Sequence, residues 1–332
     1  MPGFSEIIGH EQIIDHLQNA IRLNKVSHAY ILNGAERSGK MMLAEAFATA
    51  LQCEQQTAEP CLKCRSCRQA EGKNHPDIIY LTHEKPNTIS VDDVRKQIND
   101  SVTVKPYSAQ SKYKVYIIDE AEKMNEQAQN ALLKTIEEPP SYVVILLLTT
   151  NADSFLQTIR SRCVRLNLKA VSDEKIHRML MKKYQVVDYK ADVCTAFAQG
   201  NVGKAVMLAG SSDFNELKDK TVWLVRKIGE IEVYDLMEEV KAIGGFSRMD
   251  DFFDLLMMWY RDVLFYKASG TEQGIIFKEQ IHEIARQAER SSYQGLNDIL
   301  NMIEQTRKRL RSNVNQDISL ELLLINIKEN IE

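Results

Sequence analysis

The stretch from Ala29 to Met42 limits the possible folds of this chain more than any other part of the sequence. It reads Ala-Tyr-Ile-Leu-Asn-Gly-Ala-Glu-Arg-Ser-Gly-Lys-Met-Met. The first four residues are predicted to form a short buried strand, residues 34–40 have the spacing of a phosphate-binding loop, and residues 40–52 are predicted to be helical. A strand, a loop and a helix in this order are typical of an α/β fold with a parallel sheet.

The predicted phosphate loop lacks one of its usual parts. Gly34 and Gly39 would let backbone N–H groups converge on phosphate, and Lys40 would reach the β- and γ-phosphates. The residue after this lysine normally supplies a hydroxyl that ligates magnesium, but here it is Met41. A thioether is a poor ligand for a hard cation that prefers oxygen. We therefore expect no independent ATPase activity, whereas the sequence leaves open whether ATP or ADP still binds.

An acidic pair follows the predicted strand that begins at Lys114. In phosphate-loop enzymes, the first acid at such a strand end holds the magnesium shell and the second polarises the attacking water. Asp119 and Glu120 occupy these two positions, about eighty residues after the loop. Together with Gly34, Gly39 and Lys40 they form a candidate, partly degraded nucleotide site.

Apolar runs that alternate with helical patterns predict a parallel sheet covered on both faces. Further strands are expected at residues 77–81, 142–150 and about 164–168, and a helix is expected to precede the first strand within residues 4–24. From residue 170 onward, only helical patterns follow. The predicted domains are residues 1–169, an α/β phosphate-loop domain with a cysteine-rich insert at 53–75, then a small helical lid at 170–210, and an all-α collar at 211–332.

Four of the six cysteines are closely spaced. Cys53, Cys61, Cys64 and Cys67 can close a tetrahedron around one zinc ion, because two-residue gaps separate the last three and a short loop separates the first. The alternative is four unrelated thiols. Four thiolates leave no open coordination position, so we expect the zinc to be structural rather than catalytic.

The composition of the chain limits which partners and which cellular compartment it is expected to have. Hydrophobic residues make up 44% and charged residues 27% of the 332 residues, and the net charge is −4. An acidic chain is a poor candidate for gripping nucleic acid over a broad surface. The sequence contains neither an apolar run long enough for a membrane span nor a recognisable signal peptide, so we expect a cytoplasmic protein without membrane partners.

Two helical segments near the C-terminus allow two interpretations each. Residues 251–260 are rich in large apolar side chains, which favours a central bundle helix over an exposed partner surface. The basic cluster at residues 307–311 favours a solvated helix face or a complement to the helix dipole, while a role near DNA or a partner stays open.

These motifs together resemble the AAA+ clamp-loader family, and the resemblance covers essentially the whole chain. The matching segments are Ile8-Gly9-His10-Glu11, His28-Ala29-Tyr30, the four-cysteine insert, Ile118-Asp119-Glu120-Ala121, the run from Asn130 to Pro140, and Ser161-Arg162-Cys163. The resemblance implies an AAA+ phosphate-loop domain, a lid and a collar. It also implies a hetero-pentameric ring with delta and tau/gamma subunits, which loads a sliding clamp on primed DNA beside a DNA polymerase.

The resemblance assigns roles to further residues. Arg162 corresponds to an arginine finger that is offered to the ATP of a neighbouring subunit. Thr150 or Asn151 lies near the sensor-one position, and Lys204 lies near the sensor-two position, where the family usually has arginine.

Within this family, the phosphate loop separates two groups of subunits. It is intact in the tau/gamma motors and commonly degraded in the delta-prime group, so Met41 favours a delta-prime-like, non-hydrolysing scaffold. The alternatives are an ATP-hydrolysing motor of the tau/gamma type and, less favoured by the acidic composition, a zinc-dependent DNA-binding protein.

Overall fold

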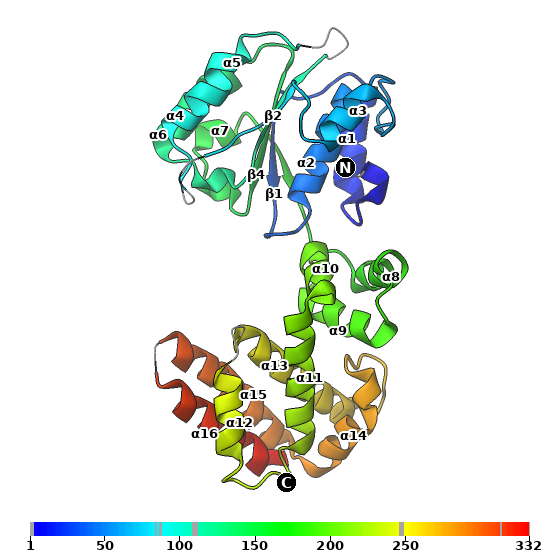
Figure 1. Ribbon diagram of the computed structural model, residues 1–332, viewed down its shortest axis with the longest axis vertical. Helices are drawn as coiled ribbons and strands as arrows, with labels where there is room; N and C mark the ends of the chain where they lie inside the picture. The colour runs from blue at the N-terminus through cyan, green and yellow to red at the C-terminus, as the bar shows by residue number, and fades with distance from the viewer. Residues whose placement is uncertain are drawn as a thin grey trace. The chain divides into compact units, whose positions relative to one another are not determined.

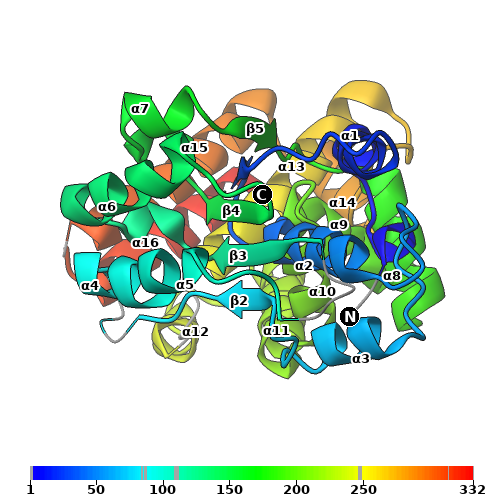
Figure 2. The same cartoon turned by 90° about the horizontal axis from the view of Figure 1, so that it is seen from above.

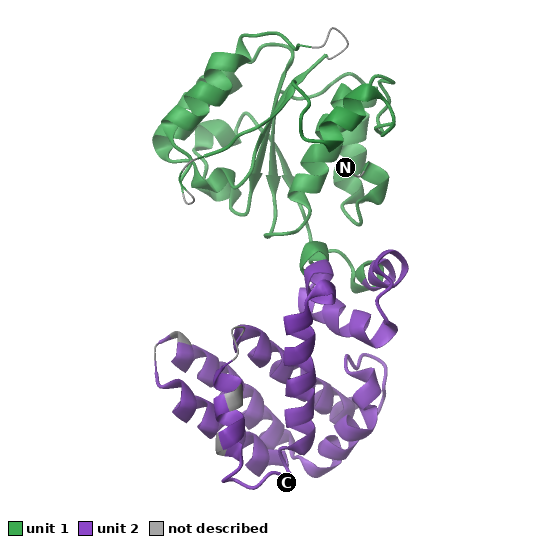
Figure 3. Ribbon diagram, in the orientation of Figure 1, with its two compact units in different colours: residues 1–176, 200–204 green, residues 177–199, 205–332 purple. Residues whose placement is uncertain are grey.

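The computed structural model describes residues 3–83, 85, 88–107, 112–245, 249–312 and 314–331. The chain forms two compact units (Figure 3). Unit 1 contains residues 1–176 and 200–204, and unit 2 contains residues 177–199 and 205–332. Within the described ranges, all named strands belong to unit 1 and unit 2 is helical.

Unit 1 is built around a five-stranded parallel sheet with the strand order β2-β3-β4-β1-β5 (Figures 1 and 2). The strands are β1 (Ala29–Asn33), β2 (Ile78–Tyr80), β3 (Lys114–Ile118), β4 (Val143–Thr149) and β5 (Val164–Asn167). The predicted parallel sheet is therefore confirmed. The phosphate loop follows β1. Because β1 lies between β4 and β5, this loop begins at the carboxyl end of an interior strand and not of an edge strand.

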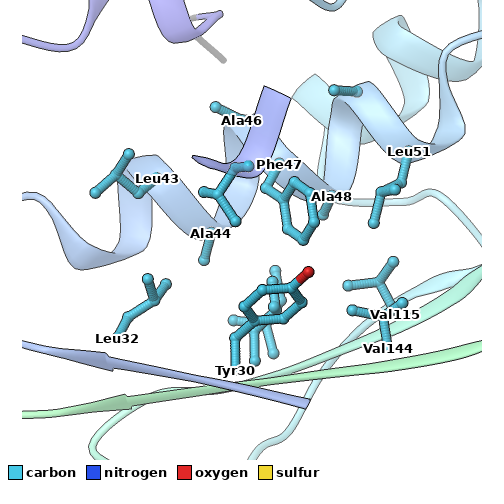
Figure 4. Close-up of a cluster of buried hydrophobic side chains, with 14 of the residues drawn as sticks. Tyr30, Leu32, Leu43, Ala44, Ala46, Phe47, Ala48, Leu51, Val115 and Val144 are labelled. Carbon is cyan, nitrogen blue, oxygen red and sulfur yellow. The ribbon is translucent and has the colours of Figure 1, made fainter. Parts of the chain in front are cut away.

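Both faces of the sheet are covered by apolar packing. Alternate residues of a strand point to opposite faces, and in β1 Tyr30 packs into one core while Ile31 packs into the other. On the first face, the ring of Tyr30 meets Phe47 of the helix α2 (Lys40–Gln52) edge to face, with centroids 5.4 Å apart (Figure 4). On the second face, Ile31 shares a core with Leu132 of the helix α6 (Glu126–Glu137).

The predicted helix within residues 4–24 is interrupted. Residues 9 and 10 adopt left-handed backbone angles, with φ of 76° at Gly9 and 61° at His10. A Cβ at Gly9 would lie 2.5 Å from Cγ2 of Val171, so only glycine fits this approach of two distant segments. The regular helix therefore starts only at Glu11.

A capping box is present at Ser90, where the helix α4 begins. The Ser90 hydroxyl accepts a hydrogen bond from the backbone N–H of Asp93, and the Asp93 carboxylate accepts one from the backbone N–H of Ser90. From Ser90 onward the chain forms two short α segments that flank a π-helical turn. The helical segments of unit 1 not yet placed are η1 (Phe4–Glu6), α1 (Glu11–Arg22), α3 (Arg65–Glu71), α4 (Val91–Val94), η2 (Arg95–Asn99), α5 (Asp100–Val102), η3 (Ala121–Lys123), η4 (Ala152–Ser154) and α7 (Gln157–Arg160).

Ten helical segments follow the sheet in the described residues. They are α8 (Asp173–Tyr184), α9 (Asp188–Ala198), α10 (Val202–Gly210), α11 (Ser212–Lys227), α12 (Leu236–Gly244), α13 (Met249–Ser269), η5 (Lys278–Gln280), α14 (Ile281–Arg290), α15 (Tyr293–Arg311) and α16 (Gln316–Ile331). The first residues of α8 and α10 are grouped with unit 1, and α9 is grouped with the C-terminal helices. The division at residues 169, 210 and 332 into a phosphate-loop domain, a lid and a collar stays a prediction.

The helix α13 forms the centre of unit 2. Its large side chains at residues 252, 253, 255, 256, 259 and 260 are almost fully buried, which confirms the prediction of a central bundle helix. The indole N–H of Trp259 donates to Gln287 Oε1 at 2.9 Å, and the Gln287 amide donates to the carbonyl oxygen of Val225 at 2.7 Å. This chain of bonds joins α11, α13 and α14. Across the described parts of the chain, no helix combines the length and apolar character needed to span a bilayer.

Candidate functional site

The phosphate loop keeps the compact shape that the sequence predicts. The backbone N–H of Gly34 donates to the carbonyl oxygen of Thr149 at 3.1 Å, which fixes the start of the loop to the end of β4. A Cβ at Gly34 would lie 2.8 Å from Cβ of Leu168 and 2.9 Å from Oγ of Ser38. Gly39 caps α2 with φ of 98°, a backbone angle that glycine adopts without strain. Both glycines are therefore needed for the local geometry.

The Lys40 ammonium is folded back onto the loop. It donates to the carbonyl oxygens of Gly34 at 2.7 Å and Ala35 at 2.8 Å, and the side chain is 8% exposed. Burial lowers the pKa of Lys40, while the negative charges of Glu122 and Asp119 oppose that shift. A phosphate group would have to replace two hydrogen bonds to draw this ammonium out of the loop.

Met41 has an apolar environment. Its side chain is partly buried and packs against the core between the sheet and α2. The position that normally carries the magnesium-binding hydroxyl therefore contributes to packing instead.

The two predicted acids, Asp119 and Glu120, interact with neighbouring residues of the chain. Oδ1 of Asp119 accepts a hydrogen bond from the backbone N–H of Glu120 at 2.9 Å, and the Glu120 carboxylate lies 2.6 Å from the ammonium of Lys123. Glu120 has φ of 47°, in the left-handed region, where the chain turns from β3 into η3. Both side chains are exposed.

A third acid was not predicted. Glu122 Oε1 accepts hydrogen bonds from the backbone N–H of Thr150 at 3.1 Å and from its hydroxyl at 2.6 Å. Burial alone would raise the pKa of Glu122, but the bonds from Thr150 lower it below its ordinary value. The Glu122 charge also has the largest electrostatic effect on Lys40. The only signal in the sequence is its place in the run Asp119–Glu122, two residues beyond the expected acids.

Asn151, predicted near the sensor-one position, caps a short turn. Its side-chain oxygen accepts from the backbone N–H of Asp153 at 3.1 Å, and its own N–H donates to Oγ1 of Thr149 at 3.0 Å. The neighbouring Thr150, rather than Asn151, contacts the acid beside the loop. The assignment of Asn151 to a nucleotide site stays a prediction.

The start of α10, which carries Lys204, is attached to the phosphate loop. The N–H of Gly203 donates to the carbonyl oxygen of Arg37 at 3.2 Å, and the Asn201 amide donates to that of Glu36 at 2.7 Å. Asn201 also accepts from the backbone N–H of Lys204 at 3.0 Å. These bonds bring the predicted sensor-two residue and the loop into one structural unit.

Arg162 lies in the turn between α7 and β5. Its Nη2 is 3.2 Å from Oε1 of Glu137, and its Nη1 donates to the carbonyl oxygen of Thr158 at 3.0 Å. The arginine and glutamate side chains are 40% and 41% exposed. The pair is thus a surface ion pair, and the role of Arg162 as an arginine finger stays a prediction.

The four predicted cysteines form one cluster. Their sulfur atoms all lie within 4.8 Å of one another, and Cys61 Sγ is 4.0 Å from Cys67 Sγ. Sulfurs bound to zinc at about 2.3 Å in a tetrahedron would be separated by about 3.8 Å. Backbone N–H groups of Cys61, Cys64 and Cys67 each donate to the preceding cysteine sulfur of the set at 3.4 Å. The four cysteines can therefore bind a metal ion.

The thiols of this cluster differ in acidity. Hydrogen bonds from backbone N–H groups, led by that of Lys63, lower the pKa of Cys61 to about 6, whereas burial raises the pKa of Cys53 and of Cys67. A cation at the centre would favour all thiolates. The insert around the cluster is fixed to the start of the chain, because the Glu59 carboxylate accepts from the backbone N–H of Ser5 at 3.1 Å and from the amide of Gln18 at 3.0 Å.

The basic cluster at residues 307–311 is partly explained by packing within unit 2. Arg307 pairs with the Asp254 carboxylate and stacks over the ring of Phe253 with 5.8 Å to its centroid. Its side chain is 17% exposed. The side chain of Arg311 lies outside the described set.

Comparison with known proteins identifies the family. Residues 9–172 match the family described as DNA polymerase III, delta subunit, and residues 234–329 match its C-terminal counterpart. The chain is 29% identical over 331 residues to DNA polymerase III subunit delta' of Bacillus subtilis, covering 96% of each protein. The chain belongs to the DNA polymerase III delta-subunit family. The predicted resemblance to clamp-loader subunits is thereby confirmed.

Members and relatives of this family differ in length. The subunit tau of Bacillus subtilis is 28% identical over 348 residues, which cover 98% of this chain but 61% of that protein. The subunit tau/gamma of Haemophilus influenzae is 38% identical over 178 residues, which cover 53% of this chain and 25% of that protein. The chain thus spans less than two thirds of the length of the tau and tau/gamma relatives, and nearly the whole of the delta' relative.

Similar solved structures include a gamma-subunit-related protein of Thermotoga maritima. It is 20% identical, covers 95% of this chain and 99% of its own, and has a TM-score of 0.41. The Holliday-junction branch migration motor RuvB of the same organism is 16% identical, covers 99% of this chain and 88% of its own, and has a TM-score of 0.45.

Proposed function

We propose that this chain is a delta-prime-type clamp-loader subunit that acts as a scaffold without hydrolysing ATP. It works in a five-membered ring with delta and tau/gamma-type subunits and helps to load a sliding clamp on primed DNA. The observation that carries the scaffold role is Met41. Its side chain is partly buried and packs against the apolar core at the position where magnesium needs a hydroxyl, and Lys40 donates to the loop's own carbonyl groups.

In this proposal, Arg162 acts as an arginine finger toward a neighbouring subunit. An exposed pair such as Arg162 and Glu137 contributes only about 0–1 kcal/mol to stability, so releasing the guanidinium costs little. A guanidinium presents several N–H donors in a fixed fork that matches phosphate oxygens. Arg162 can thus exchange the Glu137 carboxylate for the γ-phosphate of ATP bound by a neighbouring subunit.

The metal of the cysteine cluster is zinc in this proposal, and its role is structural. Four cysteine sulfurs at tetrahedral spacing fill all coordination positions, which leaves none for a reacting water. The cytoplasm is a suitable compartment, because its reducing conditions keep the four thiols available as ligands.

ATP turnover by the purified chain tests the scaffold role. We expect no magnesium-dependent turnover, because magnesium lacks one protein ligand and the γ-phosphate lacks its fixed counter-charge. The Met41→Thr variant, which restores a hydroxyl, shows how much of the defect lies at this position. Robust turnover by the unmodified chain, abolished by Lys40→Ala, would favour the motor function instead.

A reconstituted clamp loader tests the arginine finger. A finger supplied by a neighbour accelerates phosphoryl transfer by about 10³- to 10⁵-fold at its site, so we expect Arg162→Ala to lower clamp- and DNA-stimulated ATP turnover strongly. The melting temperature should hardly change. Arg165→Ala is the matched control, because Arg165 is 41% exposed and lies 3.5 Å from a surface carboxylate. Unchanged turnover in an intact Arg162→Ala complex would show that no finger is used.

A further inference from the structure

Unit 2 contains a second group of side chains that could hold a metal ion, which the proposed function does not use. His177 lies on α8, and Asp188 and Asp192 lie one turn apart on α9. Nε2 of His177 is 3.3 Å from Oδ1 of Asp188 and 3.2 Å from Oδ1 of Asp192. One ligand atom from each residue lies within 4.8 Å of the other two.

The spacing of these three atoms fits a small divalent ion. Zinc binds imidazole nitrogen and carboxylate oxygen at about 2.0–2.1 Å, and a tetrahedral angle then places the ligand atoms about 3.3 Å apart. The two separations measured from His177 Nε2 agree with this value. Imidazole and carboxylate are also ligands that zinc and neighbouring transition metals accept.

The ring nitrogen at the centre of this group is orphaned. Nε2 of His177 is shielded from solvent and makes no hydrogen bond of acceptable geometry to any residue that the structure describes. The two carboxylate oxygens lie 3.3 and 3.2 Å from Nε2 but outside hydrogen-bond geometry, so a hydrogen on Nε2 satisfies the three atoms poorly. A metal ion bound by all three atoms would satisfy them together.

Lys278 forms an ion pair with one carboxylate of this group from outside it. Its ammonium lies 2.8 Å from Oδ2 of Asp192, the oxygen that does not face His177. Carboxylates that ligate metals are commonly held by a further charged or hydrogen-bonding group, which orients the ligating oxygen. Lys278 thus fixes the Asp192 carboxylate with Oδ1 directed toward the histidine.

We propose that His177, Asp188 and Asp192 form a binding site for a divalent transition-metal ion of the zinc class. The ion cross-links α8 to α9, two helices that are otherwise joined by a short connection at residues 185–187. Three protein ligands leave one position for water, so this site is more open than the four-cysteine cluster. It shares no residue with the phosphate loop or with Arg162.

A cobalt titration of the full chain tests this site. The cysteine cluster is first filled with one equivalent of Zn²⁺, and Co²⁺ is then added. Cobalt bound by nitrogen and oxygen gives weak visible bands without the near-ultraviolet charge-transfer bands of a cobalt–thiolate site. We expect one further equivalent to bind with the nitrogen and oxygen spectrum. No further binding, or a thiolate spectrum only, would overturn the proposal.

Variants locate the binding and separate a metal ion from a proton. We expect His177→Gln and Asp192→Asn to weaken cobalt binding by at least about tenfold, and Lys278→Met to weaken it by about 10- to 100-fold as an outer contact does. His282→Gln, a change of an exposed histidine in the same unit, should leave binding unchanged. Circular dichroism confirms that each variant is folded. Equal cobalt affinity in His177→Gln, or a His177 ring whose NMR signals respond to pH but not to cobalt, would show that no metal site exists there.

Discussion

The contact between Gly203 and the phosphate loop can be tested by adding a single methyl group. A Cβ at Gly203 would lie 2.4 Å from the carbonyl oxygen of Arg37 and 2.9 Å from its Cβ. Atoms at such distances overlap, and the nearest one belongs to the backbone, which cannot rotate away. We therefore expect Gly203→Ala to push the start of α10 off the loop.

The size of this effect follows from three contributions. Overpacking costs about 1–3 kcal/mol, and losing the hydrogen bond from the Gly203 N–H to Arg37 costs about 1 kcal/mol more. Alanine in place of glycine favours the helix by about 1 kcal/mol. The net loss is about 1–3 kcal/mol for the attachment of α10, which corresponds to a fall of roughly 5- to 150-fold in local amide protection.

Hydrogen exchange of the peptides that cover residues 34–40 and 200–204 is the suitable assay. Both tryptophans of the chain, Trp223 and Trp259, lie in unit 2, so tryptophan fluorescence does not report on the loop. Gly210→Ala in the same helix is the matched control, because a Cβ there meets no atom within 4 Å. It should be neutral or slightly stabilising. Protection of the loop that is unchanged or higher in Gly203→Ala would refute the argument.

Three further predictions concern the cysteine cluster and unit 2. Cys64→Ser should remove the metal from the cysteine cluster and make the insert accessible to protease while the helices of unit 2 stay folded; metal analysis showing no bound zinc in the unmodified chain would contradict this. Gln287→Ala should destabilise unit 2 by about 2–5 kcal/mol, because it empties a buried site and leaves Trp259 Nε1 without its hydrogen-bond partner. Urea unfolding followed by tryptophan fluorescence measures this loss of stability. A loss below about 1 kcal/mol would show that the hydrogen bonds of Gln287 matter little. Burial, with a smaller contribution from Glu238, raises the pKa of Glu239 in the folded state. The stability that this group contributes is thus present below its ordinary pKa of 4.5 and is lost as the pH rises through the raised pKa of the folded state. Glu239→Gln should therefore stabilise unit 2 at pH 7 and lose this advantage near pH 4. An increase in stability that is the same at both pH values would refute the assignment.

The parts of the fold that the sequence predicted well depend on local patterns. The continuous apolar run of β4 is buried at every position, and a run of that length flanked by polar residues allows little besides a central strand. The helix α2 begins at Lys40 and ends at Gln52 as predicted, because Gly39 fixes its start and the cysteine insert follows its end. The cysteine spacing likewise required no knowledge of distant residues.

The parts that were missed depend on contacts between distant residues. The turn at Gly9 is imposed by Val171, which lies far along the chain. Glu122 became the acid beside the loop because Thr150, at the end of another strand, donates two hydrogen bonds to it. No period or spacing in the sequence carries such information, since it arises only when the sheet brings the ends of β3 and β4 together.

Glu59 connects the cysteine insert to the start of the chain. Its carboxylate accepts hydrogen bonds from Ser5 and Gln18. His10 lies between these two residues in the sequence, and its ring donates to the carbonyl oxygen of Ser38 in the phosphate loop at 3.2 Å. An insert that lost its local fold would therefore release the first segment of the chain from Glu59, whereas the strands of the sheet would keep their own backbone pairing.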